Sequence, residues 1–494
     1  MPAAFACNEL PPCRLALGIC ILQREFEAAF HRFRSARHVN HVFQGTATTP
    51  RDDLRQFFQR ISGEIVAVAM CNIVKLRLDR VIYFRVRMSN AIHRWPAGTV
   101  DVLLAVCIME IRTLAPHNFG QVSRGMNVCR QRGSCHGGLR LIGKMWCSCP
   151  TMITLYDNTQ RLHAPETFVV AGRPQPIPET PIRIDMLMKG VGYLASQVEK
   201  PPPVTMDDIA AVHDRRYLTF LETLRERWAN VPNSSDIPLP NVYAIQRASL
   251  PPLSYPEAVV GQAGYHLGDG ACPVTEHTLA AALASAACAI EGARHVASGT
   301  RLIYALCRPP GHHAASDLAA GFCFFNNSAL AAQHLTAKGH RTAILDIDVH
   351  HGNGTEAIFY DSADVLTVSI HCHPKRFYPF FWGYDTENGR GAGEGYNLNL
   401  PLERGTDINA YLAALETALQ RITDFGTTHL VLASGLDIAI DDPFKAFAIR
   451  TEDFATIGAR IAQLRLPTVV VQEGGYPSES LGDNLASLLK GLGA

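Results

Sequence analysis

From Met152 onward, short apolar stretches rich in β-branched residues alternate with longer segments whose apolar positions recur with the period of a helix. We predict strands in the short stretches, at residues 302–307, 342–349, 365–371, 428–434 and 468–473. The segments 328–339 and 408–426 have the pattern of amphipathic helices. Because strands that alternate with helices form a mostly parallel sheet covered on both faces, the pattern predicts an α/β domain.

Two further features place the start of this domain. Residues 152–163 open with a stretch typical of a first strand. Residues 201–224 begin with a proline run, after which Thr205 and Asp208 have the spacing of a capping box and apolar positions recur with helical period. We therefore divide the chain into an N-terminal segment, residues 1–151, and a domain over residues 152–494.

The N-terminal segment differs from the domain in composition. The first 150 residues hold 20 Lys and Arg against 9 Asp and Glu, whereas the remainder holds 25 against 36. No helix caps or hairpin turns frame the apolar runs, and the cysteine spacings match no zinc module. Three hypotheses stay open: a start site assigned too early, a poorly structured extension, or a functional domain. The basic charge comes without a nucleic-acid-binding motif, so we expect no nucleic acid partner.

The composition of the whole chain narrows the class of protein. It is 47% hydrophobic and 18% charged with a formal net charge of zero, the profile of a soluble globular protein. No apolar run reaches the roughly 18 residues that span a bilayer, so we expect no membrane partner. The five cysteines after residue 150 show no paired spacing, which indicates a reducing compartment, and we expect a cytoplasmic protein.

Polar residues follow four of the predicted strands at the end where each strand terminates. His312 and His313 follow the first strand, the segment 346–350 ends the second, and Asp437 and Tyr476 come after the fourth and fifth. Open α/β sheets bind ligands outside the carboxyl ends of their strands, so we expect these side chains to meet at one edge.

Asp346, Asp348 and His350 alternate along the second predicted strand, and alternate side chains share one face of a strand. Asp348, His350 and Asp437 together offer two carboxylates and one imidazole. Three such ligands with an open position are typical of a catalytic zinc site, so we predict one Zn²⁺ per subunit here. A zinc ion polarises a carbonyl and lowers the pKa of a bound water.

The neighbouring residues have the chemistry that hydrolysis needs. The His312 and His313 pair can supply a general base and a general acid. Asp346 and Asn353 would orient these two imidazoles. Tyr476 can donate its hydroxyl to an oxygen on which negative charge develops. Together these residues predict metal-assisted hydrolysis of an amide.

Six stretches carry a resemblance to a known family: RPPGHHA, GFCFFNN, LDIDVHHGNGT, TVSIH, LDIAIDDP and EGGYP. From about Met152 to the C-terminus, the chain resembles the histone deacetylase and acetylpolyamine amidohydrolase family, above all its bacterial acetylpolyamine amidohydrolases. The resemblance implies the arginase–deacetylase fold, with a central eight-stranded parallel sheet flanked by helices. It also implies zinc-dependent hydrolysis of the amide of N-acetylated amines, such as short acetylated diamines and polyamines, with release of acetate and free amine.

The resemblance assigns roles to residues that match the family motifs. It implies that His313 is the principal general base and acid, and that His312, paired with Asp346, is its electrostatic partner. It implies that Tyr476 holds the scissile carbonyl oxygen. A substrate channel would be lined by Gly321, Phe322 and Phe381. A structural potassium ion near the zinc would be bound by oxygens of Asp346, Asp348, His350 and Ser369.

Residues 248–273 resemble the insert through which bacterial acetylpolyamine amidohydrolases dimerise and narrow the entrance to the active site. The resemblance therefore implies a homodimer. Those relatives read the distal amine of a polyamine with acidic residues, and the matching positions here are Val260 and Ala271. We therefore expect a small cationic substrate, shorter than a long polyamine.

Three alternative functions stay open. A protein lysine deacetylase would need an entrance wide enough for a folded protein tail. A ureohydrolase of the same fold would need a second metal ligand two residues after Asp437, where this chain has Ala439. An inactive binding module would have lost a ligand or the tyrosine, whereas Asp348, His350 and Tyr476 are all present.

Overall fold

The structure is a computed structural model that describes residues 152–494. The N-terminal segment, residues 1–151, lies outside the described residues, and the three hypotheses about it stay predictions.

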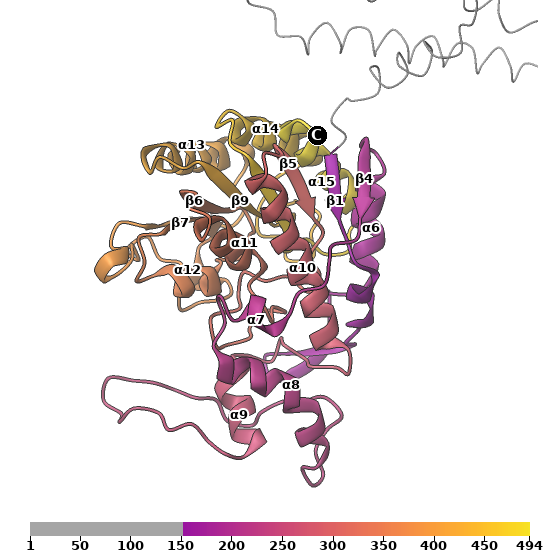
Figure 1. Cartoon of the computed structure of the whole chain (residues 1–494), viewed down its shortest axis with the longest axis vertical. Helices are drawn as coiled ribbons and strands as arrows, with labels where there is room; N and C mark the ends of the chain where they lie inside the picture. The colour runs from indigo at the N-terminus through magenta and orange to yellow at the C-terminus, as the bar shows by residue number, and fades with distance from the viewer. Residues whose placement is uncertain (1–151) are drawn as a thin grey trace, which may run out of the picture. The chain divides into compact units, whose positions relative to one another are not determined.

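One eight-stranded sheet forms the centre of the domain (Figure 1). Its strands, in spatial order, are β4 (Ser196–Glu199), β1 (Met152–Leu155), β5 (Leu302–Ala305), β10 (Thr468–Gln472), β9 (His429–Ser434), β6 (Thr342–Asp346), β7 (Val365–Cys372) and β8 (Asn397–Leu402). All seven neighbouring pairs are parallel. The predicted α/β fold with a central eight-stranded parallel sheet is therefore confirmed. A separate antiparallel hairpin joins β2 (Thr167–Val170) to β3 (Arg173–Pro176).

Helices cover both faces of the sheet, as expected for parallel strands. One face packs against α6 (Ile182–Val191), α13 (Ile408–Asp424), α14 (Thr451–Ala462) and α15 (Leu481–Leu492). The other packs against α10 (Thr278–Ala297), α11 (Asn327–Thr336) and α12 (Asn353–Phe359). In β10, Val470 belongs to the first core, whereas Val469 and Val471 belong to the second, because successive side chains of a strand point to opposite faces.

A third core lies within the lower lobe of the domain, the part around α8 (Arg215–Ala229) and α9 (Val259–His266) at the bottom of Figure 1. It joins these two helices to the apolar face of α10. The helical pattern within residues 201–224 does not form one continuous helix, because the chain forms a short α7 (Met206–Ile209) and then a separate α8. Asp214 caps α8 by accepting a hydrogen bond from Arg216 N–H. The capping box of Thr205 and Asp208 is confirmed at the start of α7.

Strand β6 is shorter than predicted and ends at Asp346, so Asp348 and His350 lie in the turn beyond it. The expectation that all three residues share one face of a strand is therefore wrong. Asp346 Oδ1 accepts the N–H of Asp348 at 3.0 Å, and Asp348 Oδ1 accepts the N–H of His350 at 2.9 Å. These side-chain bonds to the backbone two residues on replace the hydrogen bonds of a strand and curl the chain into a turn.

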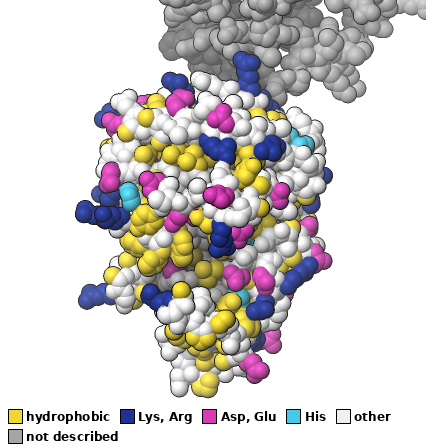
Figure 2. Space-filling view, turned by 90° about the vertical axis from the view of Figure 1, so that its left-hand side faces the viewer, with side chains coloured by type: hydrophobic (Ala, Val, Ile, Leu, Met, Phe, Trp, Pro, Cys, Tyr) yellow, Lys and Arg dark blue, Asp and Glu magenta, His cyan; other side chains and the backbone are white. Residues whose placement is uncertain are grey.

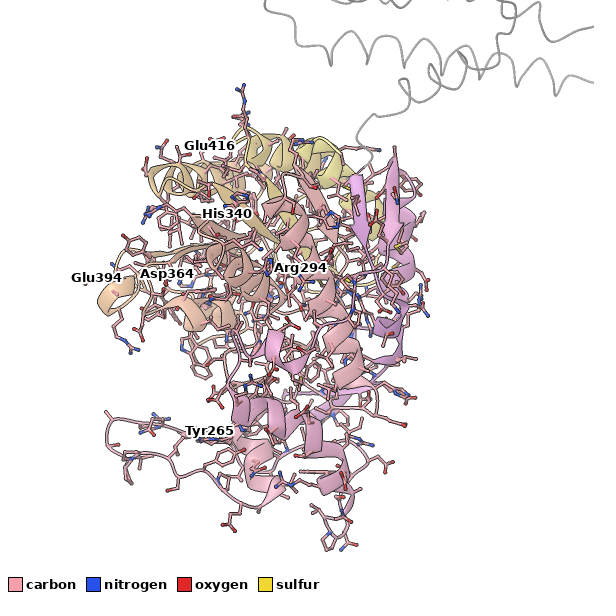
Figure 3. All side chains as sticks on the ribbon, viewed as in Figure 1. Tyr265, Arg294, His340, Asp364, Glu394 and Glu416 are labelled. Atoms are coloured by element: carbon pink, nitrogen blue, oxygen red, sulfur yellow. The ribbon has the colours of Figure 1, made fainter. Side chains whose placement is uncertain are left out.

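The insert over residues 248–273 contains both exposed chain and buried chain. Residues 241–254, which lead into the insert and form its first part, are all exposed and form an irregular loop, called here the loop of the insert. In contrast, α9 packs into the third core. The end of the loop is held by aromatic contacts, with the Tyr255 and Tyr265 rings 5.2 Å apart (Figure 3 labels Tyr265 on α9). Figure 2 shows hydrophobic side chains gathered around a hollow on this side of the molecule.

No helix within residues 152–494 is long and apolar enough to cross a membrane. The five cysteines of that part of the chain are all buried and free of disulfide bonds.

Candidate active site

Three groups that can bind a metal converge beyond the carboxyl ends of β6 and β9. His350 Nδ1 lies 3.1 Å from Asp348 Oδ1 and 3.2 Å from Asp437 Oδ2, and the ligand atoms of these residues all lie within 4.8 Å of one another. The backbone orients both carboxylates. Val349 N–H donates to Asp437 Oδ1 at 3.0 Å, and Gly474 N–H donates to Asp348 Oδ2 at 2.7 Å. The structure thus brings together all three predicted zinc ligands.

The electrostatics of this group favour a bound cation. Burial raises the pKa of Asp437 to about 6, and the nearby charge of Asp348 adds to this effect. Burial alone would lower the pKa of His350, but its hydrogen bonds to Asp348 and Asp437 raise the pKa to about 9. Two buried carboxylates therefore hold a proton on the imidazole between them. Metal ions compete with protons for such ligands, and a buried set of two carboxylates and one imidazole fits Zn²⁺.

A second cluster that could bind a metal lies next to this group. It consists of His312, Cys323 and Glu473. The Glu473 carboxylate is already occupied, because it accepts hydrogen bonds from Gly311 N–H at 2.6 Å, His312 N–H at 3.0 Å and Ser328 Oγ–H at 2.7 Å. Glu473 therefore braces the turn that carries the two histidines.

His312 and His313 follow β5 and are both buried. Their ring centroids lie 4.0 Å apart, and the His313 ring lies 5.9 Å from that of His350. Each ring has a partner at Nδ1: Asp346 Oδ2 at 2.9 Å for His312, and Asn353 Oδ1 at 2.7 Å for His313. Because both oxygens accept, each Nδ1 carries the proton, and Nε2 of His313 keeps a free lone pair.

The two histidines differ in charge. Burial would lower the pKa of His312, but the carboxylates of Asp348 and Asp346 outweigh it and raise the pKa to about 10. Burial holds the pKa of His313 well below its usual value, and the positive charges of His312 and His350 lower it further. The pair therefore combines a cationic imidazole with a neutral one.

Tyr476 lies in the turn after β10 and is buried. Its N–H donates to Asp442 Oδ2 at 3.0 Å. Arg183, from α6, donates to the carbonyl oxygens of Gly475 and Glu473, at 2.6 Å each, and its guanidinium carbon lies 5.0 Å from the centroid of the tyrosine ring. Burial raises the pKa of the Tyr476 hydroxyl well above its usual value, so the hydroxyl stays protonated and can donate.

Aromatic rings link this tyrosine to the metal-binding group and to the predicted channel. Phe444 packs edge-on against both His350 and Tyr476, with centroid distances of 4.9 and 5.0 Å. Phe322 lies 5.9 Å from the Tyr476 ring, and Gly321 lies so close to His313 that a Cβ there would collide with the imidazole. The structure therefore places two of the three predicted channel residues beside the histidines and the tyrosine.

Phe381, the third predicted channel residue, stands 75% exposed, and its ring contacts Trp382 at 5.8 Å. Tyr378 occupies the position beside the histidine instead, with its ring edge-on to His313 at 4.9 Å. Of the two insert positions, only Ala271 packs against the cluster of Phe322 and Tyr476, whereas Val260 packs into the third core. The role of Phe381 in the channel stays a prediction.

The expected potassium ligands lie on β6, β7 and the turn after β6. Asp346 and Ser369 are register partners in the β6–β7 pair, and both line a small cavity of about 10 Å³ between the two strands and α12. Ser369 Oγ lies 2.8 Å from His371 Nδ1. Asp348 and His350 come shortly after Asp346 in the chain, and their side chains belong to the metal-binding group.

Several residues around the site were missed by the sequence reasoning. They are Arg183, Tyr378, Phe444 and Glu473. Glu473 had a usable signal, because a carboxylate directly after an apolar strand will be buried near the same sheet edge. The others come from distant segments, and nothing in their local sequence indicates a partner in the site.

Comparisons with known proteins agree with this geometry. The profile of the family described as the histone deacetylase domain matches residues 177–492. The acetylpolyamine amidohydrolase of Burkholderia pseudomallei is 44% identical over 347 residues, covering 69% of this chain and 99% of that protein. Acetylpolyamine amidohydrolase 2 of Pseudomonas aeruginosa is 39% identical over 345 residues, covering 69% of this chain and 98% of that protein.

Solved structures agree on the fold. A crystal structure of the Burkholderia pseudomallei acetylpolyamine aminohydrolase superposes with a TM-score of 0.66 at 44% identity, covering 70% of this chain and 99% of that one. The HDA15 HD domain superposes with a TM-score of 0.56 at 25% identity, covering 69% and 91%. The extent of these matches, together with the site geometry, shows that this chain belongs to the histone deacetylase family and is an amidohydrolase.

Proposed function

We propose that this protein is a zinc-dependent deacetylase that hydrolyses the amide of small N-acetylated amines and releases acetate and the free amine. The proposal rests above all on one observation, the convergence of the His312 and His313 pair and Tyr476 on the group of Asp348, His350 and Asp437.

In the proposed reaction, Asp348, His350 and Asp437 hold the zinc ion. When bound, zinc supplies a Lewis acid that polarises the amide carbonyl and makes a nearby water more acidic. His313 serves as the general base, since its neutral imidazole keeps a lone pair on Nε2 while Asn353 accepts the Nδ1 proton. It then returns the proton to the departing amine nitrogen.

His312 and Tyr476 support this step in different ways. His312 stays cationic against Asp346 and so favours the build-up of negative charge beside it. Tyr476 donates its hydroxyl to the carbonyl oxygen as that oxygen gains charge. Arg183 holds the backbone on both sides of the Gly-Gly turn and thereby keeps the tyrosine in place.

Small acetylated diamines fit the walls of the site. Phe322 and Tyr378 flank Tyr476 and His313, and aromatic walls suit an alkyl chain. The relatives of Burkholderia and Pseudomonas are named for acetylpolyamines. Ala271, the insert position beside Phe322, carries no charge to read a distal amine, which favours shorter substrates.

Protein lysine deacetylation is the second candidate. It is favoured by the exposed aromatic side chains of Phe380, Phe381 and Trp382, which a peptide chain could contact. A ureohydrolase is disfavoured, because the position that would supply a further metal ligand is the buried Ala439.

Three further parts of the proposal concern the potassium ion, the pairing of two copies, and the compartment and substrate. A potassium ion would bind near Asp346 and Ser369, which line the small cavity described above. Two copies would pair through the 248–273 insert, whose loop exposes Leu250 and Leu253, apolar side chains that a partner would cover. We expect the protein to act in the cytoplasm on a small cationic substrate.

A substrate panel tests the proposal. The zinc-loaded protein is assayed for acetate release from N-acetylputrescine, N-acetylspermine, acetyl-lysine and an acetylated histone-like peptide, with the Tyr476→Phe variant as the control. We expect the highest kcat/KM on the short diamine. A comparable kcat/KM on the peptide would favour the protein deacetylase, and no acetate from any amide would refute the deacetylase.

A further inference from the structure

One carboxylate of the insert reaches the wall of the active site. Asp269 Oδ2 accepts hydrogen bonds from the Tyr378 hydroxyl at 2.6 Å and from Gly321 N–H at 3.0 Å. Its other oxygen, Oδ1, accepts the N–H of Ala271 at 2.8 Å. The carboxylate thus joins three segments that are far apart in the sequence: the insert, the loop before α11 and the loop after β7.

Both of the distant partners of Asp269 contact the same imidazole. The Tyr378 ring stands edge-on to His313, with centroids 4.9 Å apart and an interplanar angle of 87°. Gly321 has a φ of +52°, and a side chain at this position would collide with the His313 ring. Asp269 therefore restrains two of the surfaces that hold His313, while Asn353 holds its Nδ1.

We propose that Asp269 is a positioning residue for deacetylation, which keeps the His313 imidazole in its reactive orientation through Tyr378 and Gly321. This inference rests on the function proposed above. The insert thereby acts on the reaction itself in addition to shaping the entrance, because its carboxylate acts on the base through the channel wall.

The bonding of Asp269 argues for positioning rather than for direct contact with a substrate amine. Its three donors are neutral: one phenol and two peptide N–H groups. They occupy both oxygens and leave little of the four-site accepting capacity of a carboxylate. A residue that reads the distal ammonium of a substrate would instead keep an oxygen open to it.

Kinetics on a charged and a neutral substrate separate the two roles. The variants Asp269→Asn, Tyr378→Phe and the double variant are compared with the zinc-loaded wild type on N-acetylputrescine and on uncharged N-butylacetamide. We expect each single variant to lower kcat by about 10-fold to 100-fold on both substrates, as for a misplaced reacting group, with KM changed by less than about 3-fold. The double variant should be no slower than the slower single variant, because both changes disrupt the same hydrogen bond between Asp269 and Tyr378.

The controls keep the outcome decisive. Glu257→Gln removes an exposed carboxylate from the same insert and should leave kcat and KM unchanged. Zinc content and melting temperature identify variants that fail to fold. If Asp269→Asn fails to fold, Tyr378→Phe, which keeps the aromatic ring, tests the same contact. A loss confined to KM on the charged substrate, additive losses in the double variant, or unchanged kcat would overturn the inference. Absence of activity in the wild type would instead contradict the proposed function.

Discussion

The metal-binding group and the loop of the insert are built in opposite ways. Asp348, His350 and Asp437 are buried, follow strands of one parallel sheet, and have their carboxylates oriented by backbone N–H groups. Residues 241–254 are exposed along their whole length and form no helix or strand. The difference teaches that the residues proposed for the chemistry are held by the rigid end of the sheet, whereas a surface loop can change in sequence and length without harm to the core.

The largest effect should come from removing a metal ligand. Asp348→Ala deletes one of three ligands and also the acceptor of Gly474 N–H, so we expect little bound zinc and a loss of kcat well beyond the roughly 100-fold typical of an outer-shell partner. Elemental analysis beside steady-state kinetics measures both. The exposed Asp385→Ala is the matched control, and full zinc occupancy in Asp348→Ala would refute the assignment.

Loss of the tyrosine hydroxyl should separate catalysis from metal binding. Tyr476→Phe keeps the ring between Phe322 and Phe444 but removes the donor to the charged oxygen. We expect kcat to fall by about 10²–10³-fold with the zinc content unchanged. A kcat near that of the wild type would contradict the role given to Tyr476.

Burial should also make the stability of the domain depend on pH. His213 accepts Asn326 N–H at Nε2 and bonds Ser316 O through Nδ1, and burial lowers its pKa to about 4. The unfolded chain, with an ordinary histidine pKa near 6.5, binds more protons between these values, so stability should fall as pH drops from about 6.5 to 4. This residue should lower the free energy of unfolding by about 3 kcal/mol over that pH range.

Urea unfolding between pH 4.5 and 7 measures this slope. His213→Gln can still accept from Asn326 and donate to Ser316 but cannot bind a proton. The variant should therefore lower the slope of unfolding free energy against pH by the contribution of about one proton. An unchanged slope in the variant would show that other groups cause the acid sensitivity.

A smaller effect is expected from the outer partner of His312. Asp346→Asn keeps an acceptor near His312 Nδ1 but removes the negative charge that holds this imidazole cationic. We expect zinc to be retained and kcat/KM to fall by about 10-fold to 100-fold. Loss of zinc in this variant would show that Asp346 supports the metal ligands directly.

The loop of the insert should tolerate the most drastic change. Replacing residues 246–253 by a short Gly-Ser linker keeps the Ala244 N–H bond to Gly264 O and the packing of Tyr255. We expect kcat on N-acetylputrescine to change little and the preference over an acetylated peptide to fall by about 10-fold, because the entrance widens. A large loss of kcat on the diamine would show that the loop reaches the chemistry.

Much of the fold and the site was readable in the sequence because it depends on local patterns. β-branched stretches placed β5, β7, β9 and β10 within about two residues of their observed ends. The polar residues after these strands were expected to meet because parallel strands point the same way, and the structure brings His313, Asp437 and Tyr476 to one place.

Two errors show where local reasoning failed. The helical pattern after Thr205 does not run unbroken to residue 224, because α7 ends at Ile209 and the side chain of Asp214 caps a new helix. The strand expected to run to residue 349 ends at Asp346, because side-chain hydrogen bonds to the backbone turn the chain. In both places a short polar side chain competed with the regular backbone pattern.

The sequence by itself determined the parallel sheet, the polar residues at its carboxyl edge and the chemistry that these residues can perform, since periodicity and residue type are local properties. Only the tertiary structure decided that Arg183 braces the turn of Tyr476, that Tyr378 rather than Phe381 packs on His313, and that Asp269 of the insert ties down that wall. These contacts join segments separated by up to about 290 residues, and their partners are chosen by packing and burial in the folded chain.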